Sequence, residues 1–247
     1  MNLLLFEQYE QEADRLLLID HRAKHIHTVL KLNVGDTLRI GMVHGKMGRG
    51  KIISMDDNAV ELEVQLDSAP PTPPDVELIL ALPRPIMLQR ILKQATVMGV
   101  RRFHLIRSAK VEKSFFQTPV LEPKKIKELL LEGLSQAVDT HLPEVLIHRR
   151  FKPFVQDIVP TLAGCGLIAH PGGAAELPDV YPRSGEKKKI LLAVGPEGGW
   201  NDFEVENFLE QGFLPFSMGN RILHVDTAVV ALLAQLEILR IMGQARF

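Results

Sequence analysis

Residues 190–204 read ILLAVGPEGGWNDFE, which is a short apolar run, a glycine-rich turn and the start of a helix. The apolar run is too short for a helix and ends at a glycine, so it predicts a strand buried on both faces, as in a parallel sheet. The glycines of residues 195–199 permit positive φ and close approach of a ligand to the backbone. Asn201 and Glu204 have capping-box spacing, and Gly212 suits the end of the helix. Open α/β sheets bind ligands at such places, beyond the carboxyl ends of strands.

A second loop of the same kind follows in the chain. Residues 214–217 predict a short strand, and residues 218–227 (MGNRILHVDT) lead into an apolar helix from about 228 to 242. Neither loop is a standard phosphate loop. Two loops of this kind close together indicate a ligand that is held mainly by backbone groups.

The composition is that of an ordinary globular protein. With 247 residues, 46% apolar and 24% charged, the chain is long enough for one or two domains with a core. No apolar run approaches the ~18 residues of a membrane-spanning helix, so we expect no membrane partner. The one cysteine, Cys165, excludes an internal disulfide and fits a reducing cytoplasm. We interpret it as a small buried thiol rather than a nucleophile.

The net charge of −1 alone argues against a nucleic-acid partner, but the charge is unevenly distributed. Residues 84–127 contain eleven Lys and Arg residues and two acidic residues. Such a segment can present a cationic face to phosphates. The alternative is a solvated surface that acidic helices elsewhere balance. The candidate phosphate contacts are Arg84, Arg107, Lys110 and Lys113.

Residues 1–70 predict a small β-rich domain, with strands near 34–41, 48–53 and 59–66 and a short helix between. The segment 69–74 holds four prolines in six residues, so we interpret it as a linker and place the domain boundary there. His21, His25 and His27 at first suggest a metal site. Because no cysteine or further acidic partner completes a ligand set, we interpret them as surface histidines and expect no metal.

Residues 75–247 form the second predicted domain. Apolar strands alternate with helices of ten to fifteen residues, which predicts βαβ units and a parallel sheet. The expected strands are 76–82, 103–106, 145–148 and 167–169, and the expected helices are 86–98, 124–139 and 152–162.

Several well-known sites are absent from the sequence. It has no GxGxxG after an early strand, no GxxxxGK[ST], no HExxH and no GxSxG, so dinucleotide, P-loop, zincin and α/β-hydrolase chemistry are unsupported. Glu197 in the glycine turn has two possible roles, as a general acid or as an acceptor for backbone N–H groups.

Residues 192–199 (LAVGPEGG) and 218–228 (MGNRILHVDTA) resemble the two C-terminal motifs of the SPOUT superfamily of RNA methyltransferases. Within it, the chain looks most like the ribosomal small-subunit uridine-N3 methyltransferases. The resemblance extends over nearly the whole chain, and the N-terminal segment resembles that family's PUA-like RNA-binding domain. Supporting matches lie at residues 81–84, 94–100, 111–114 and 142–144.

The resemblance implies an α/β fold with a parallel sheet and a C-terminal deep trefoil knot, a rare exception to the rule against threaded chains. It further implies a homodimer, packed partly through the last helix, and S-adenosylmethionine (SAM) as cofactor. The cofactor pocket is then expected from three loops: Ala169, His170 and Pro171; Val194, Gly195, Glu197, Gly198 and Gly199; and Met218, Gly219, Ile222, Leu223 and Thr227.

The implied reaction is methyl transfer to N3 of a uridine in small-subunit (16S) ribosomal RNA. Since N3 carries a proton at neutral pH, catalysis must align the nitrogen and help to remove that proton. Arg221 could stabilise negative charge on the uracil oxygens, and its alternative role is a structural salt bridge. His224 and Asp226 are further candidate catalytic residues, at positions where the family usually has Arg and Glu. Asp226 could also cap the last helix, and His224 can lose its charge near neutral pH.

Two other functions compete with this prediction. One is a SPOUT methyltransferase acting on another ribosomal or transfer RNA site. The other is a non-catalytic RNA-binding protein, against which the intact glycine turn counts, because pure binding needs no backbone-lined pocket.

Overall fold

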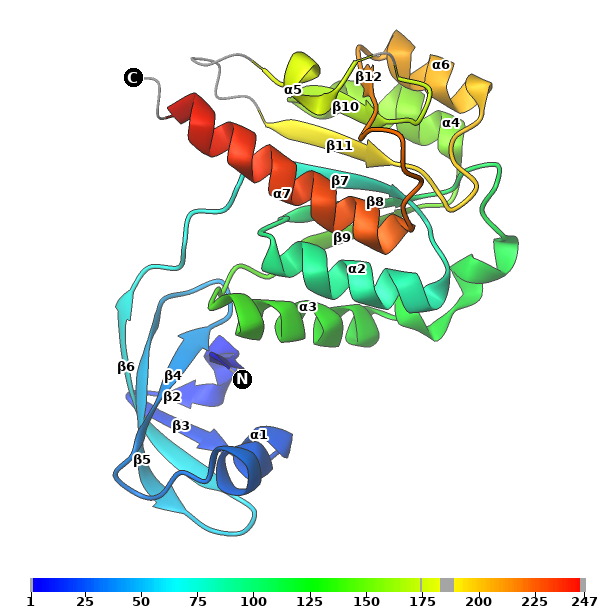
Figure 1. Cartoon of the computed structure of the whole chain (residues 1–247). Coiled ribbons are helices and arrows are strands. Elements are labelled where there is room, and N and C mark those ends of the chain that lie inside the picture. The colour runs from blue at the N-terminus through cyan, green and yellow to red at the C-terminus, as the bar shows by residue number, and fades with distance from the viewer. Residues whose placement is uncertain (1, 174, 183–188, 245–247) are drawn as a thin grey trace. The chain divides into compact units, whose positions relative to one another are not determined.

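The computed structural model describes residues 2–173, 175–182 and 189–244 (Figure 1). Contacts divide the chain into two compact units. The first consists of Met1–Thr72 with Leu131–Leu142, and the second of Pro73–Leu130 with Pro143–Phe247. In the described ranges, no helix has the length and apolarity needed to cross a membrane.

The first unit is built on a six-stranded sheet of order β1-β4-β5-β6-β3-β2, in which only β1 and β4 pair in parallel. On β6, Val60, Leu62 and Val64 are buried, and the polar residues between them are more exposed, so the period-two pattern places the core on one face. The predicted β-rich domain is thus a single mixed sheet. Its elements are β1 (Leu4–Phe6), β2 (Gln11–Glu12), β3 (Arg15–Leu18), α1 (His21–His25) with a π-turn (Ile26–Leu30), β4 (Thr37–Met42), β5 (Met47–Met55) and β6 (Val60–Ser68).

The end of helix α3 (Pro123–Ala137) also belongs to the first unit. Its Leu134 is buried in one cluster with Leu3. The N–H of Leu3 donates to the Ser135 carbonyl at 3.1 Å, and the Ser135 hydroxyl donates to the Leu3 carbonyl at 2.6 Å. The proline linker therefore coincides with one boundary between the units. The inclusion of residues 131–142 depends on contacts between distant parts of the chain, which no local pattern announces.

The second unit contains the predicted parallel sheet. Six strands lie in the order β12-β10-β11-β7-β8-β9, and every neighbouring pair is parallel. The two central strands β11 and β7 are buried at every position, which explains their uninterrupted apolar sequences. The strands are β7 (Val76–Ala81), β8 (Arg102–Ile106), β9 (Glu144–His148), β10 (Cys165–Ala169), β11 (Ile190–Val194) and β12 (Leu214–Phe216).

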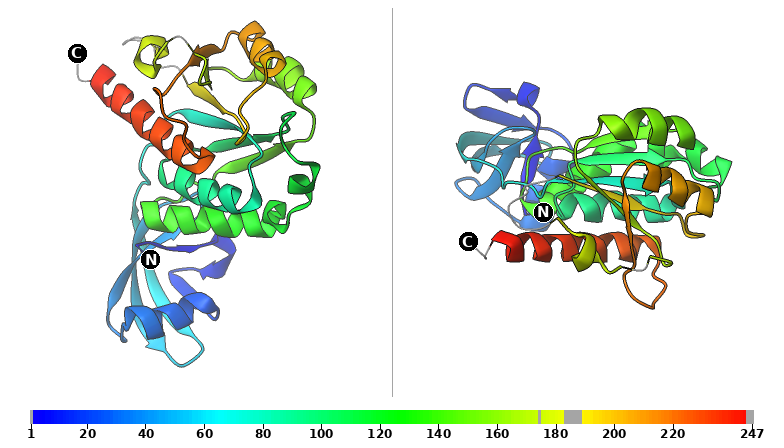
Figure 2. Two further views of the ribbon diagram at one scale, coloured as in Figure 1. Left: turned by 45° about the vertical axis from the view of Figure 1, so that its right-hand side comes forward. Right: turned by 90° about the horizontal axis from the view of Figure 1, so that it is seen from above.

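Helices cover both faces of this sheet (Figure 2). On one face α2 (Pro85–Val97) packs against α7 (Val225–Gln244). On the other, α6 (Asp202–Glu210) lies beside the segment that starts with α4 (Phe151–Pro153), and the rings of Phe151 and Phe208 meet edge to face at 5.7 Å. A short helix, α5 (Leu177–Val180), follows β10.

The helix expected over residues 152–162 is not regular, so this prediction was wrong in its detail. Beyond α4 the chain forms a π-turn (Phe154–Ile158) and then a 3-10 turn (Val159–Thr161). Pro160 prevents a regular α-helix over the second half of this segment, because proline lacks the N–H that would donate to the carbonyl of residue 156.

Candidate active site

Three loops that the sequence analysis assigned to one pocket do meet at the carboxyl edge of the second sheet. β10 lies between β12 and β11, so its last residue, Ala169, is opposite both Val194 and Phe216. The loops that leave these strands are therefore neighbours (Figure 1). The N–H of His170 donates to the Phe216 carbonyl at 2.9 Å and joins the first loop to the third.

The glycine turn and the last loop each contain a glycine beside open space. Gly199 has φ +67° and Gly219 has φ +96°, and a Cβ at either position would meet no atom within 4 Å. Only glycine adopts such angles without strain. Gly195 has a different reason, because its Cβ would lie 3.2 Å from the Trp200 ring, so close packing requires glycine there.

Polar groups at these loops are available to a ligand. The His170 Nδ1 and Trp200 Nε1 atoms are buried and find no hydrogen-bond partner among the described residues. Buried polar atoms are normally satisfied, so unpartnered ones mark a place where another molecule can bind.

Glu197 accepts a backbone N–H, which is one of the two roles that the sequence left open. Its Oε1 accepts from the N–H of Arg84, the residue before α2, at 3.1 Å. On the next residue, the Gly198 carbonyl accepts from Lys110 Nζ at 2.6 Å. These two contacts attach the glycine turn to the ends of β7 and β8. The side chains of Arg84 and Lys113 are exposed.

The last loop is open to solvent. Arg221 is exposed and has no ion-pair or hydrogen-bond partner in the part of the chain that the structure describes. A structural salt bridge, the alternative role for this arginine, is therefore not formed here. Ile222 is 94% exposed and Leu223 37% exposed, so these side chains do not enclose a cavity in this chain alone.

The Asp226 carboxylate interacts with two other groups of the protein. Its Oδ2 lies 3.3 Å from Arg90 Nη1 on α2, and its Oδ1 accepts the Thr227 N–H at 3.1 Å. The residue lies in the first turn of α7, where the helix dipole favours a negative charge, rather than at the N-cap. His224, which is exposed, accepts the Ala228 N–H with its carbonyl at 2.8 Å.

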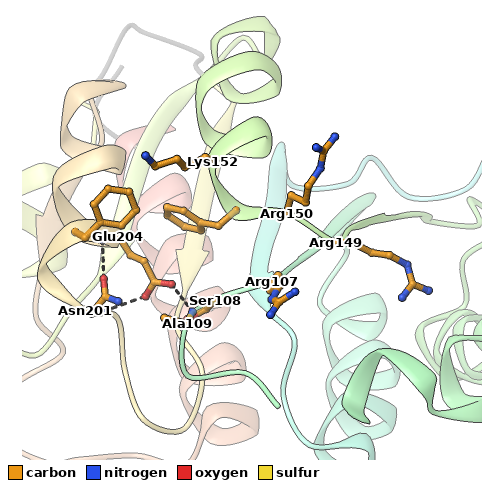
Figure 3. Close-up of a pocket in the computed structure, with 10 residues that line it drawn as sticks. Arg107, Ser108, Ala109, Arg149, Arg150, Lys152, Asn201 and Glu204 are labelled. Carbon is orange, nitrogen blue, oxygen red and sulfur yellow. Dashed lines mark hydrogen bonds between the residues drawn. The ribbon is translucent and has the colours of Figure 1, made fainter. Parts of the chain in front are cut away.

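A pocket of about 300 Å³ lies beside the glycine turn, between the ends of β8 and β9 and the start of α6. Figure 3 shows Arg107, Arg149 and Arg150 on one side of it, and Lys152 with Asn201 and Glu204 on the other. Of the four basic residues, the sequence analysis selected Arg107 alone, because the others lie beyond the basic run 84–127. The pattern HRRFK (residues 148–152), which starts at the last residue of strand β9, is the signal that could have revealed them. The pocket is lined by Arg107, Ser108, Ala109, Arg149, Arg150, Phe151, Lys152, Asn201, Phe203 and Glu204.

Glu204 joins two walls of this pocket. Its carboxylate is nearly inaccessible to solvent, with Oε1 accepting the Ala109 N–H at 2.7 Å and Oε2 accepting the Asn201 N–H at 3.1 Å (Figure 3). Asn201 Oδ1 in turn accepts the Glu204 N–H at 2.8 Å. The predicted capping box is thus confirmed. The buried charge is satisfied by backbone donors, which also fix the β8 loop to α6.

A chain of titratable side chains runs under the pocket from β7 to β9. Glu77 Oε2 lies 3.1 Å from His104 Nε2, and His104 Nδ1 lies 3.2 Å from His148 Nε2. Burial raises the pKa of Glu77, but hydrogen bonds from Lys189 and His104 outweigh it and hold that pKa below its usual value. Burial lowers the pKa of His104, and burial with the neighbouring His104 lowers the pKa of His148 to about 4. Both imidazoles are therefore neutral at pH 7. Since His104 Nε2 faces the Glu77 carboxylate, this nitrogen carries the proton, and His104 Nδ1 accepts the hydrogen bond from His148 Nε2.

The buried, neutral His148 predicts that the free energy of unfolding decreases in acid. An unfolded histidine has a pKa of about 6.5, above the value of about 4 for His148 in the fold, so below pH 6.5 the unfolded chain binds the proton more tightly. Stability should therefore fall as the pH falls from about pH 7 to about pH 5, by less than about 2 kcal/mol because solvent screens this half-buried imidazole. We expect urea unfolding of a His148→Gln variant, which keeps a donor for His104, to show a correspondingly weaker pH dependence. His27→Gln, at an exposed histidine, is the control. Equal pH dependence in all three proteins would contradict the prediction.

The chain is similar to known RNA methyltransferases in sequence and in fold. The family model of the RNA methyltransferase domain matches residues 70–237. Ribosomal RNA small subunit methyltransferase E of Treponema pallidum is 28% identical over 244 residues, which cover 94% of this chain and 88% of that protein. The Bacillus subtilis protein of the same name is 23% identical over 249 residues and covers 96% of each chain.

Two solved structures share the fold over almost the whole chain. The putative methyltransferase of Legionella pneumophila, in complex with the bound cofactor SAM, superposes with a TM-score of 0.79 at 20% identity, covering 96% of this chain and 97% of that one. Ribosomal RNA small subunit methyltransferase E from Neisseria gonorrhoeae, bound to S-adenosyl methionine, has a TM-score of 0.77 at 20% identity and covers 96% and 98%. Since the family model spans well over half of the chain, including the three loops at the sheet edge, this protein belongs to the RNA methyltransferase domain family.

Proposed function

We propose that this protein is a SAM-dependent methyltransferase that methylates N3 of a uridine in small-subunit ribosomal RNA. The observation that carries the proposal is the meeting of three loops at the ends of β10, β11 and β12, with open space beside Gly199 and Gly219. Membership of the family supports methyl transfer to RNA. The names of the Treponema pallidum and Neisseria gonorrhoeae proteins support the small-subunit RNA and the cofactor.

The donor set of the three loops fits SAM. Backbone groups of the glycine turn and the unpartnered His170 Nδ1 suit the polar edges of adenine and of the methionyl part. When bound, SAM supplies an electrophilic methyl group. The side chains of Ile222 and Leu223 are exposed and apolar, so they could cover the adenine ring. This contact would bury apolar surface of both side chains that solvent now reaches. The residues we assign to the cofactor are Ala169, His170, Pro171, Val194, Gly195, Glu197, Gly198, Gly199, Met218, Gly219, Ile222, Leu223 and Thr227.

Two residues of the last loop carry the proposed chemistry on the uridine, and a third residue, at the start of α7, positions the loop. Arg221, whose guanidinium is unpaired in the described part of the chain, stabilises negative charge on a uracil oxygen as N3 loses its proton. His224, exposed and three residues further on, is our candidate for the proton acceptor. Asp226, paired with Arg90, acts by positioning: it holds the start of α7 and so the end of this loop.

The RNA is proposed to lie over the basic segment that follows β7 and β8. Arg84, Arg107, Lys110 and Lys113 all lie in the loops at the carboxyl edge of the sheet, the edge from which the glycine turn also leaves. Lys110 also holds Gly198, so this residue would couple the RNA surface to the cofactor turn. The mixed sheet of the first unit supports a PUA-like RNA-binding domain. Ribosomal RNA as substrate would place the protein in the cytoplasm.

The resemblance to SPOUT enzymes further leads us to infer a C-terminal trefoil knot and a homodimer. The knot is supported by the strand order, because β12 returns to pair with β10 on the side away from β11. The dimer is supported by apolar side chains that remain exposed on α7, Ile238 at 57%, Ile241 at 51% and Met242 at 52%.

The proposed function is tested with the full-length protein and methyl-labelled SAM. Small subunits, large subunits and transfer RNA from a strain that lacks the protein serve as substrates, and the methylated nucleotide is mapped. We expect label on N3 of one uridine of the small-subunit RNA. Label on another RNA would favour the alternative SPOUT specificity. No transfer to any of these substrates would leave a non-catalytic RNA-binding protein and overturn the proposal.

A further inference from the structure

The pocket between β8, β9 and α6 is strongly cationic. Arg107, Arg149, Arg150 and Lys152 line it, and none of them forms an ion pair with a carboxylate in the described ranges. The acidic side chain present, Glu204, has both oxygens engaged by backbone N–H groups. The positive charge is therefore not neutralised within the protein, and an anionic ligand is favoured there.

Aromatic rings lie among these cations. Lys152 Nζ is 5.1 Å from the centroid of the Phe203 ring, and Arg149 Cζ is 5.6 Å from that of Phe116. Phe203 remains 45% exposed although it stands beside Phe151, with the ring centroids 6.3 Å apart. A large exposed ring next to unpaired basic groups is the combination with which proteins hold single-stranded RNA, by stacking a base and pairing the phosphate.

A buried hydroxyl adds an unused polar group to the same wall. Ser108 lines the pocket, is 1% exposed, and its Oγ has no partner in the described part of the chain. The adjacent Ala109 N–H is already taken by Glu204. Ser108 Oγ is therefore a donor that a phosphate or ribose oxygen would satisfy.

The pocket is also directly connected to the proposed cofactor turn. Asn201 and Glu204 line the pocket and follow Gly199 by a few residues in the chain. Lys110, the residue after the lining residue Ala109, donates to the Gly198 carbonyl. A strand of RNA that places one uridine at the last loop could continue along the carboxyl edge of the sheet, at which this pocket also lies.

We propose that the pocket binds one nucleotide of single-stranded RNA that flanks the target uridine. The phosphates on its two sides would pair with Arg150 and with Lys152, one each, and its base would lie against Phe203. This subsite rests on the proposed function only for the identity of the neighbouring nucleotide; its binding to RNA does not depend on methyl transfer. It assigns a role to Arg150, Lys152 and Phe203, which lie outside the predicted RNA surface.

The charge half of the proposal is tested by the salt dependence of RNA binding. Anisotropy titrations use the full-length protein and a labelled single-stranded RNA that contains uridine. Each phosphate contact with single-stranded RNA contributes about 0.7 to the slope of log affinity against log salt. We expect Arg150→Gln and Lys152→Gln each to lower the slope by about 0.7. Arg240→Gln removes the same charge near the C-terminal end of α7, outside the basic segment 84–127, and should leave the slope unaltered.

Removal of the Phe203 ring tests the proposed stacking of the base. Loss of one base-stacking contact typically lowers affinity by about tenfold, without loss of a charge. We therefore expect Phe203→Ala to weaken RNA binding about tenfold with the salt slope unchanged. Leu209→Ala is the matched control, since it removes another exposed apolar side chain from the same helix α6.

The outcomes separate this proposal from the proposed function. If the three pocket variants bind RNA like their controls while the wild type methylates RNA, the pocket is not a nucleotide subsite and the enzyme assignment stands. If the pocket variants show the expected losses but the wild type transfers no methyl group, the subsite stands and the enzyme assignment fails. Circular dichroism and SAM calorimetry on each variant ensure that a misfolded protein is not scored as a binding loss.

Discussion

An Arg221→Ala variant is expected to methylate RNA about a hundredfold more slowly than the wild type in single-turnover assays. The guanidinium is exposed and unpaired among the described residues, so its removal breaks no observed protein contact. Its interaction with the uracil oxygen strengthens as N3 loses its proton, so the loss falls on the transition state rather than on binding. SAM and RNA affinities should stay within several-fold of wild type.

Two further variants define what the arginine does. Arg221→Lys should recover only part of the rate, because a point charge does not reproduce the planar fork of guanidinium donors. Asn220→Ala, an exposed neighbour in the same loop, should react at nearly the wild-type rate and so controls for disturbance of the loop. A wild-type rate in Arg221→Ala would remove this residue from the catalytic assignment.

Valine at position 199 is expected to weaken SAM binding roughly ten- to a hundredfold, which corresponds to the loss of one or two hydrogen bonds. Gly199 has φ +67° and open space where a Cβ would project. A β-branched side chain would occupy that space and also strain the backbone. Isothermal calorimetry on the folded variant measures the loss.

Gly212→Val separates the effect on the ligand from the effect of strain. Gly212 also has positive φ (+79°) and open space around it, but it follows helix α6, away from the three loops. Both variants should lose thermal stability to a similar degree, by about 1–2 kcal/mol, and only Gly199→Val should lose affinity for SAM. Unchanged SAM binding by a folded Gly199→Val protein would exclude this turn from the cofactor site.

The sequence was sufficient where local physical chemistry decides the structure. The apolar run before Gly195 could be assigned to a buried parallel strand because both faces of β11 are covered. The cap formed by Asn201 and Glu204 could be predicted because its hydrogen bonds join residues three apart. Gly99 and Gly212 both follow helix ends and have positive φ, as expected for glycines at those positions.

Sequence alone did not predict the hydrogen bonds between residues that are far apart in the chain. The partner of Glu197 is the N–H of Arg84, and the partner of Glu204 is the N–H of Ala109, contacts that span 113 and 95 residues. The contact of Asp226 with Arg90 on α2 was likewise not predicted, and it is the basis of the positioning role that we propose for Asp226. Since any distant carboxylate or amide can be a partner, periodicity and spacing contain no information about which one is chosen.

By itself, then, the sequence determined the βαβ order, the parallel sheet and the glycine turns. These features follow from short-range sterics, hydrogen bonding and the burial pattern, which operate over a few residues. Only the tertiary structure decided that β10 lies between β11 and β12, that Lys152 stands over Phe203, and that four basic residues from two strand ends share one pocket. Strand order and packing determine these contacts, because they place residues side by side that are far apart in the chain.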